Sequence, residues 1–282
     1  MKTPFAKPHE EPIIVAPLHV PKPKAPLSAL AKKAGKKGDE DDGGSELFDG
    51  KNFKAPSNAK LVYRGGPLLT HTQIYTIFWG ANWNTKPDLK AIMAGVNAFF
   101  KAIMVSPLID QLKEYNVPAY SIGHGSLLGT KNITAAPPVT SITDTTIRST
   151  LQSWIHAGTV PANTNNILYF IYFEPNIKVS MQGSASCTSF CGYHSNIGNN
   201  LFYAVMPYPS CSGCLGGLPT PLDALTGTSS HELCEAITDP IPGNGWYDNH
   251  NGEIGDICAW TFKKVAGYTV QKEWSNAAKK CV

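Results

Sequence analysis

One continuous apolar run, N-I-L-Y-F-I-Y-F over residues 166–173, constrains the fold more than any other segment of the chain. A run of this length, rich in aromatic and β-branched residues, predicts a buried central strand. Segments predicted as strand or helix lie on either side of it: a strand over 73–80, a strand and loop within 120–133, and helices over 88–104, 107–115 and 144–156. Alternation of this kind predicts a mixed α/β domain with a central sheet flanked by helices, and an α+β fold is the alternative.

The first 60 residues have a different composition from the rest. Seven prolines lie between positions 4 and 26, and residues 1–60 contain 11 lysines against 8 acidic residues. Proline removes backbone donors and holds the chain extended, so this composition predicts a disordered tail over 1–60, followed by one domain over 61–282. The apolar stretch 13–20 is interrupted by Pro17 and is too short for a signal-peptide core, so no export signal is visible. No run reaches the roughly 18 to 20 apolar residues of a membrane span.

The acidic residues of the domain are unevenly distributed. The net charge of +3 belongs to the tail, and residues 61–282 carry 13 basic and 13 acidic residues. Between Lys178 and Lys263 there is no Lys or Arg, although this stretch of 84 residues holds seven acids and six of the seven cysteines. A segment of this charge is expected to attract a cation or a positively charged partner, and a solvated acidic surface is the simpler alternative.

The sequence S-H-E-L-C-E-A-I-T-D-P over 230–240 lies in this stretch. It predicts a helix that begins at Ser229 or Ser230, and on that helix His231 and Glu235 share one face. The imidazole of His231 and the carboxylate of Glu235 would then converge on one metal ion, and Glu232 would contact a water molecule bound to that ion. This is the arrangement of H-E-x-x-H metalloproteases with Glu in place of the second His. The alternative is an amphipathic surface helix.

A glycine-rich loop downstream carries further carboxylates. Glu253 or Asp256 is expected to supply a third ligand, and the sequence leaves open which of the two does so. A second carboxylate in place of His makes calcium or manganese more competitive with zinc. We therefore expect a divalent metal, with zinc favoured and calcium or manganese as alternatives. Cys258 could tether this loop to the helix through Cys234.

The cysteines are all in the C-terminal half. Clustering in a Gly-, Asn- and Ser-rich region favours disulfides in a secreted protein over a zinc site, and a redox role for the C-x-x-C pair lacks its strand-to-helix context. Because seven is odd, one thiol is left over, and Cys281 is the expected one. The disulfide candidates are Cys187, Cys191, Cys211, Cys214, Cys234 and Cys258.

Several motifs in order resemble the exordium-like, or phosphate-induced-protein, family, over about residues 61–260. They are Y-R-G-G-P-L (63–68), I-Y-T-I-F-W-G (74–80), F-C-G-Y-H-S (190–195), Y-A-V-M-P-Y-P (203–209), S-H-E through D-P (230–240) and G-E-I-G-D-I-C (252–258). The resemblance implies an exported protein. Plant members act as cell-wall growth regulators and generally lack the His-Glu pair, whereas members with the pair resemble microbial secreted metallopeptidases. His194 and Asp239 are candidates for supporting the site, and a hydrogen-bonded structural role is the simpler interpretation of His194.

Together these features predict a secreted, monomeric, metal-dependent hydrolase, with a peptidase as the leading hypothesis. His231 and Glu235 would bind zinc with Glu253 or Asp256, and Glu232 would act as general base on a zinc-bound water in a zincin-like helix. The substrate would be a polypeptide or a cell-wall polymer. The alternative is a non-enzymatic extracellular or cell-wall-associated binding protein with a structural ion. The sequence has no G-x-S-x-G elbow, no phosphate-binding loop and no interleaved aromatic-basic surface for nucleic acid.

Overall fold

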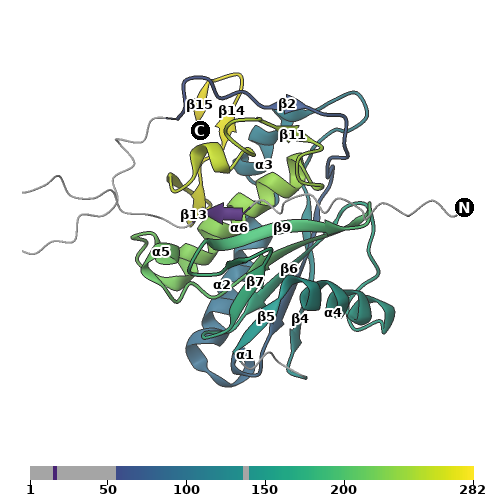
Figure 1. The fold of residues 1–282 in the computed structure, drawn as a ribbon, viewed down its shortest axis with the longest axis vertical. Coiled ribbons are helices and arrows are strands. Elements are labelled where there is room, and N and C mark those ends of the chain that lie inside the picture. Colours follow the sequence, from purple (N-terminus) through teal and green to yellow (C-terminus); the bar gives the residue numbers. More distant parts are fainter. Residues whose placement is uncertain (1–14, 18–54, 136–139) are drawn as a thin grey trace, which may run out of the picture.

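The computed structural model describes residues 15–17, 55–135 and 140–282, and its centre is a six-stranded sheet (Figure 1). Strands β4, β3, β6 and β10 run parallel to one another, and β9 and β1 add an antiparallel edge. In the order of the sheet the strands are β1 (Val15–Pro17), β9 (Phe190–Ile197), β10 (Leu201–Met206), β6 (Ile167–Phe173), β3 (Gln73–Trp79) and β4 (Ser126–Ile133).

The sheet is covered on both faces because β6 is apolar on both faces. Leu168, Phe170 and Tyr172 point into one core, and Tyr169 and Ile171 point into the other. This alternation follows from the two-residue period of a strand. The first core is covered by helices α2 and α6, and the second by α4. The prediction of an α/β domain with a central sheet flanked by helices is therefore confirmed.

The helices predicted over 88–104, 107–115 and 144–156 agree closely with the structure. The predicted helix over 107–115 divides into α3 and a 3-10 turn, and α4 begins where Thr143 caps it through its hydroxyl. The helical elements are α1 (Asn82–Thr85), α2 (Pro87–Ile103), α3 (Pro107–Gln111), η3 (Leu112–Tyr115), α4 (Asp144–His156), α5 (Ser212–Leu215), α6 (Pro221–Thr238) and η4 (Asp256–Cys258).

Among the described helices, none is long and apolar enough to cross a membrane by itself. One bent pair, Pro87–Ile103 with Pro107–Tyr115, meets the criteria of length and composition when its two members are taken together. The buried residues of both members belong to the first core.

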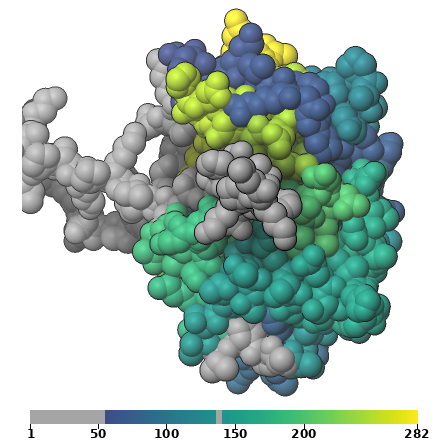
Figure 2. All heavy atoms as spheres, turned by 45° about the vertical axis from the view of Figure 1, so that its right-hand side comes forward, coloured from purple at the N-terminus to yellow at the C-terminus, as the bar shows by residue number. Residues whose placement is uncertain are grey.

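Short strands connect the C-terminal part to the start of the domain. Figure 2 shows the yellow-green segment that follows α6 lying beside the dark-blue residues near the start of the domain, in agreement with the pairing of β11 with β2. The short strands are β2 (Val62–Tyr63), β5 (Ser141–Thr143), β7 (Lys178–Met181), β8 (Ser184–Ala185), β11 (Trp246–Tyr247), β12 (Phe262–Val265), β13 (Tyr268–Gln271), β14 (Trp274–Ser275) and β15 (Lys280–Cys281).

The predicted tail needs one correction. Most of residues 1–60, namely 1–14 and 18–54, lie outside the described residues. Within the tail, however, Val15–Pro17 pairs with β9, although the proline density predicts no packed element. An edge strand tolerates proline at a bulge, and the register shifts at Ala16/Pro17.

Candidate metal centre

Helix α6 carries the predicted motif and is buried along most of its length. It begins at Pro221, where the Thr220 hydroxyl accepts a hydrogen bond from Asp223 N at 3.0 Å. The predicted start at Ser229 or Ser230 is therefore wrong, because Thr220 followed by Pro221 is the stronger N-terminal signal. All residues from Ser229 to Thr238 are buried, which excludes the amphipathic surface helix.

His231 and Glu235 share one face of α6, as their spacing predicts. Nε2 of His231 lies 3.0 Å from Oε1 of Glu235 and 3.9 Å from Oδ1 of Asp256. One ligand atom from each of these three residues lies within 4.8 Å of the other two. The backbone N–H of Asp256 also donates to Glu235 Oε1 at 3.1 Å, which fixes the loop against the helix. Asp256 is therefore the loop carboxylate that accompanies His231.

Two contacts explain how the loop approaches His231 so closely. A Cβ at Gly255 would lie 2.6 Å from His231 Nδ1 and 2.9 Å from Glu235 Oε1, so only glycine fits there. Gln271, on β13, holds the other side of the ring: its Nε2 lies 2.8 Å from His231 Nδ1 and donates to the Gly255 carbonyl at 2.9 Å. An amide at this ring nitrogen orients the imidazole.

His194 lies on β9 and enters the same cluster from the sheet. Its Nδ1 lies 3.2 Å from Glu232 Oε2 and 3.6 Å from Glu235 Oε2, and its Nε2 lies 3.6 Å from Glu253 Oε1. His194, Glu235 and Glu253 form a second group whose ligand atoms lie within 4.8 Å of one another. His194 is thus in direct contact with the candidate ligands, and Glu253 and Asp256 belong to different groups.

Asp239, just beyond the end of α6, has a supporting position. Its carboxylate accepts from the backbone N–H of Gly243 at 2.7 Å and of Asn244 at 3.0 Å. Its carbonyl lies 3.2 Å from Nε2 of His194. The side chain therefore fixes the turn after the helix, and the backbone oxygen orients His194.

Burial controls the charge states of the cluster. Burial raises the pKa of Glu232 and Glu253, and it raises that of Asp256 to about 8, with the charge of Glu235 adding to the effect. Burial alone would also raise the pKa of Glu235, but the contacts with His231 and His194 outweigh it and lower this pKa to about 2. For both histidines the neighbouring carboxylates outweigh burial and raise the pKa.

Several buried atoms of the cluster lack a hydrogen-bond partner. They are Nε2 of His231, Oε1 of Glu232, Oε2 of Glu235 and both carboxylate oxygens of Glu253. Buried polar groups are nearly always partnered, since an unmade hydrogen bond costs about 1 to 3 kcal/mol. Unpartnered oxygens and an imidazole nitrogen facing one another are a donor set that suits a divalent cation. The residues present therefore fit a metal ion.

The disulfides confirm the general prediction and correct its details. Cys187 pairs with Cys211, Cys191 with Cys214, and Cys258 with Cys281. Neither the zinc alternative nor the redox pair applies, because these four upstream cysteines are bonded to one another.

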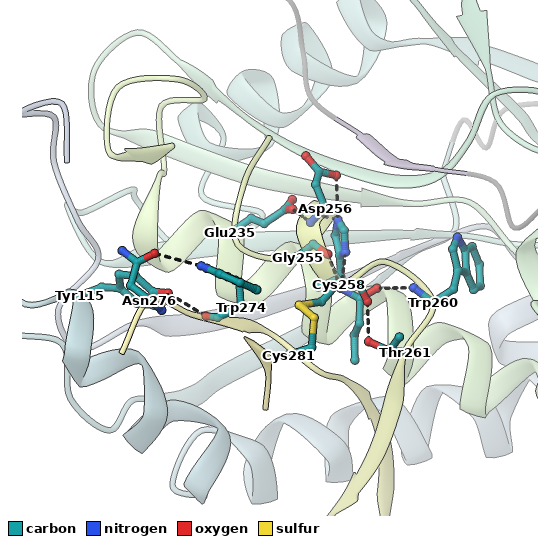
Figure 3. The surroundings of a disulfide bond; sticks show 12 residues. Tyr115, Glu235, Gly255, Asp256, Cys258, Trp260, Thr261, Trp274, Asn276 and Cys281 are labelled. Carbon is teal, nitrogen blue, oxygen red and sulfur yellow. Dashed lines mark hydrogen bonds and ion pairs between the residues drawn. A yellow bond between two sulfur atoms is a disulfide. The ribbon is translucent and has the colours of Figure 1, made fainter. Parts of the chain in front are cut away.

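The predicted spare thiol and the predicted tether are both wrong. The free cysteine is Cys234, buried within α6, and Cys258 pairs instead with Cys281. Trp274 N donates to the carbonyl of Ile254, which brings the C-terminal hairpin to the loop. Figure 3 shows this disulfide beside Gly255 and Asp256, so it anchors the ligand loop to the chain terminus instead of the helix.

Two further residues of the site carried no usable signal in the sequence. Gln271 is a single amide in a short strand, and nothing in its neighbourhood marks it as a partner of His231. Gly192 is needed because a Cβ there would lie 2.8 Å from Thr228 Cγ2 and 3.3 Å from Glu232 Oε1. Strand β9 therefore passes directly over Glu232.

No family model matches this sequence, and no curated protein matches it either. The resemblance to the exordium-like family therefore stays a prediction, and function has to be inferred from the site.

Proposed function

We propose that the protein is a secreted, metal-dependent hydrolase that cleaves polypeptides, with its centre at His231, Glu235 and Asp256. The observation that carries this proposal is the set of buried, unpartnered donor atoms that converge from α6 and the loop after it. When bound, a divalent ion supplies a Lewis acid that lowers the pKa of a water ligand and polarises a carbonyl. The three disulfides support export, because they indicate an oxidising compartment.

Glu232 is the residue suited to general-base catalysis. It follows His231 on α6, is fully buried, and its Oε1 has no hydrogen-bond donor. Its pKa is raised by burial, which makes it a stronger base than an exposed glutamate. His194, 3.2 Å from the other oxygen, orients the carboxylate and opposes its protonation. Glu232 can therefore accept a proton from an attacking water and pass it to the leaving amine.

The edge of the sheet favours a polypeptide over other substrates. In β9, Tyr193 and Gly192 pair with Val15 and Ala16 of the chain's own β1 in antiparallel register. An exposed strand edge binds extended peptides through backbone hydrogen bonds. Because Gly192 lies against Glu232, a peptide in the place of β1 would run beside the proposed base.

A Glu232→Gln variant tests this function. We expect it to retain the metal content of the wild type but to lose cleavage of an unfolded protein substrate, measured by the release of peptides. Glu174→Gln is the matched control, because Glu174 is a buried glutamate outside the cluster whose carboxylate accepts from Asn82 N at 2.8 Å. If Glu232→Gln cleaves as fast as the wild type, Glu232 is not the base.

A non-enzymatic protein with a structural ion is the second candidate, and the enclosure of the site favours it. His231, Glu235, His194 and Glu253 are each at most 1% exposed, and the side chain of Asp256 is 16% exposed. Wild-type protein that holds metal but cleaves no polypeptide would support this candidate.

A further inference from the structure

The donor atoms of the cluster divide into two groups that share a single residue. His231, Glu235 and Asp256 make one group, and His194, Glu235 and Glu253 make the other. Ligands of one metal ion lie about 2.0 to 2.2 Å from it, so they are at most about 4.4 Å apart. Each group, with its atoms within 4.8 Å of one another, needs only a small contraction to reach that size.

Glu235 turns one oxygen to each group. Its Oε1 lies 3.0 Å from Nε2 of His231, and its Oε2 lies 3.6 Å from Nδ1 of His194. The two histidines come from different elements, α6 and β9, and so reach the carboxylate from different sides. This is the position of a carboxylate that bridges two cations.

We propose that the centre holds two divalent cations bridged by Glu235, the second of them bound by His194 and Glu253. This inference deepens the proposed function and rests on its metal centre, to which it adds a second ion.

Charge supports two ions over one. Glu232, Glu235, Glu253 and Asp256 bring four negative charges when ionised, and the two histidines are neutral as ligands. One divalent ion at His231, Glu235 and Asp256 leaves the charges of Glu232 and Glu253 to a protonated His194 or to protonation of the carboxylates themselves, whereas two ions neutralise all four. The nearest lysine in sequence, Lys263, donates to Gln111 Oε1 at 2.8 Å and so does not serve the cluster.

Glu253 provides an independent observation. It is fully buried, and neither of its carboxylate oxygens has a hydrogen-bond partner. A single ion in the group of His231 would leave this carboxylate with His194, 3.6 Å away, as its charge partner and with no hydrogen-bond donor. A second ion beside His194 gives it a partner and explains why the chain retains a buried glutamate there.

The donor set also indicates the class of metal. Two histidines and four carboxylates are the inventory of dinuclear carboxylate centres in helical bundles. One imidazole with carboxylate oxygens at each ion favours harder divalent ions such as Mn²⁺ more than a cysteine- or histidine-rich site would.

Calorimetric titration of the chelator-treated full-length chain with Mn²⁺ tests the proposal. We expect about two equivalents for the wild type and about one for Glu253→Gln and for Asp256→Asn. The Glu174→Gln control should keep two. At two equivalents the electron paramagnetic resonance spectrum of the wild type should show exchange coupling between the ions, and Glu253→Gln should lose it. Far-ultraviolet circular dichroism confirms that each variant is folded.

Each result has one meaning. Saturation of the wild type at one equivalent, with cleavage of polypeptides, overturns the second ion and leaves the proposed function intact. Two equivalents in Glu253→Gln remove Glu253 from the site and also overturn the proposal. No bound metal in the wild type contradicts the second ion and the proposed function together.

Discussion

Replacing Glu253 by glutamine should change stability in opposite directions with and without metal. In the chelated protein the wild-type carboxylate is buried without a donor, and burial raises its pKa well above the usual range. An unsatisfied buried polar group costs about 1 to 3 kcal/mol and a buried charge costs more, so an amide of the same shape lowers the cost by removing the charge, although the amide also lacks partners. The chelated variant should therefore be about 2 kcal/mol more stable than the wild type, measured at pH 8.

Metal should reverse this order. An ion at 100 times its Kd stabilises the folded state by about 2.7 kcal/mol. The variant loses this contribution of about 2.7 kcal/mol at the second site, which exceeds the roughly 2 kcal/mol that it gains in chelator. With metal, the wild type should therefore be the more stable protein by less than about 1 kcal/mol.

Urea unfolding followed by tryptophan fluorescence, with a chelator and with excess Mn²⁺, measures both differences. Glu174→Gln should change stability equally under the two conditions, because residue 174 lies outside the cluster and the amide oxygen of the glutamine can still accept from Asn82 N. A Glu253→Gln variant that is less stable than the wild type in chelator would refute the argument from the unpartnered carboxylate.

Three further predictions concern the charge of the site, strand β1 and the C-terminal disulfide. The pKa of Asp256 is raised to about 8 in the folded protein without metal, so the folded state holds the Asp256 proton more tightly than the unfolded chain does. The free energy of unfolding should therefore fall by up to about 1.4 kcal/mol per pH unit as the pH rises from about 4 to 8. Urea unfolding measured at several pH values checks this, and a pH dependence of stability that is unchanged in Asp256→Asn would contradict it. The double variant Val15→Pro and Ala16→Pro removes backbone donors from β1, so it should free the edge of β9 and raise the rate of cleavage of an unfolded substrate. A rate no higher than that of an Ala29→Pro control would show that β1 does not compete with the substrate for this edge. Removing the bond between Cys258 and Cys281, which are 23 residues apart, should cost about 3 kcal/mol in urea unfolding and weaken metal binding; unchanged metal affinity would show that this disulfide does not position the ligand loop.

The sequence predicted the central elements because their patterns are strong. The run at 166–173 became β6, apolar on both faces, and the helical spacing over 144–156 matched α4. The start of α6 was misplaced because Ser229 and Ser230 are themselves good capping residues, while the actual cap, Thr220, lies nine or ten residues upstream. The strand at Val15–Pro17 was missed because its pairing with β9 is a tertiary contact that overrides a proline-rich composition.

The site was predictable only where its residues lie on one helix. A four-residue spacing places His231 and Glu235 together whatever the rest of the chain does. The separate positions of Glu253 and Asp256 depend on the conformation of a glycine-rich loop, which spacing does not determine. His194 reaches the cluster through the register of β9, and disulfide connectivity depends on which cysteines the folded chain brings together.

The metal content of the purified protein tests the central claim most directly. Elemental analysis after dialysis against buffer, with Glu174→Gln as control, should find at least one equivalent of a divalent metal in both proteins. His231→Ala should contain about one equivalent less than the wild type, because this substitution removes the imidazole that faces Glu235 at 3.0 Å. Wild-type protein that contains no divalent metal, and that binds none when Zn²⁺ or Mn²⁺ is added, would contradict the metal centre.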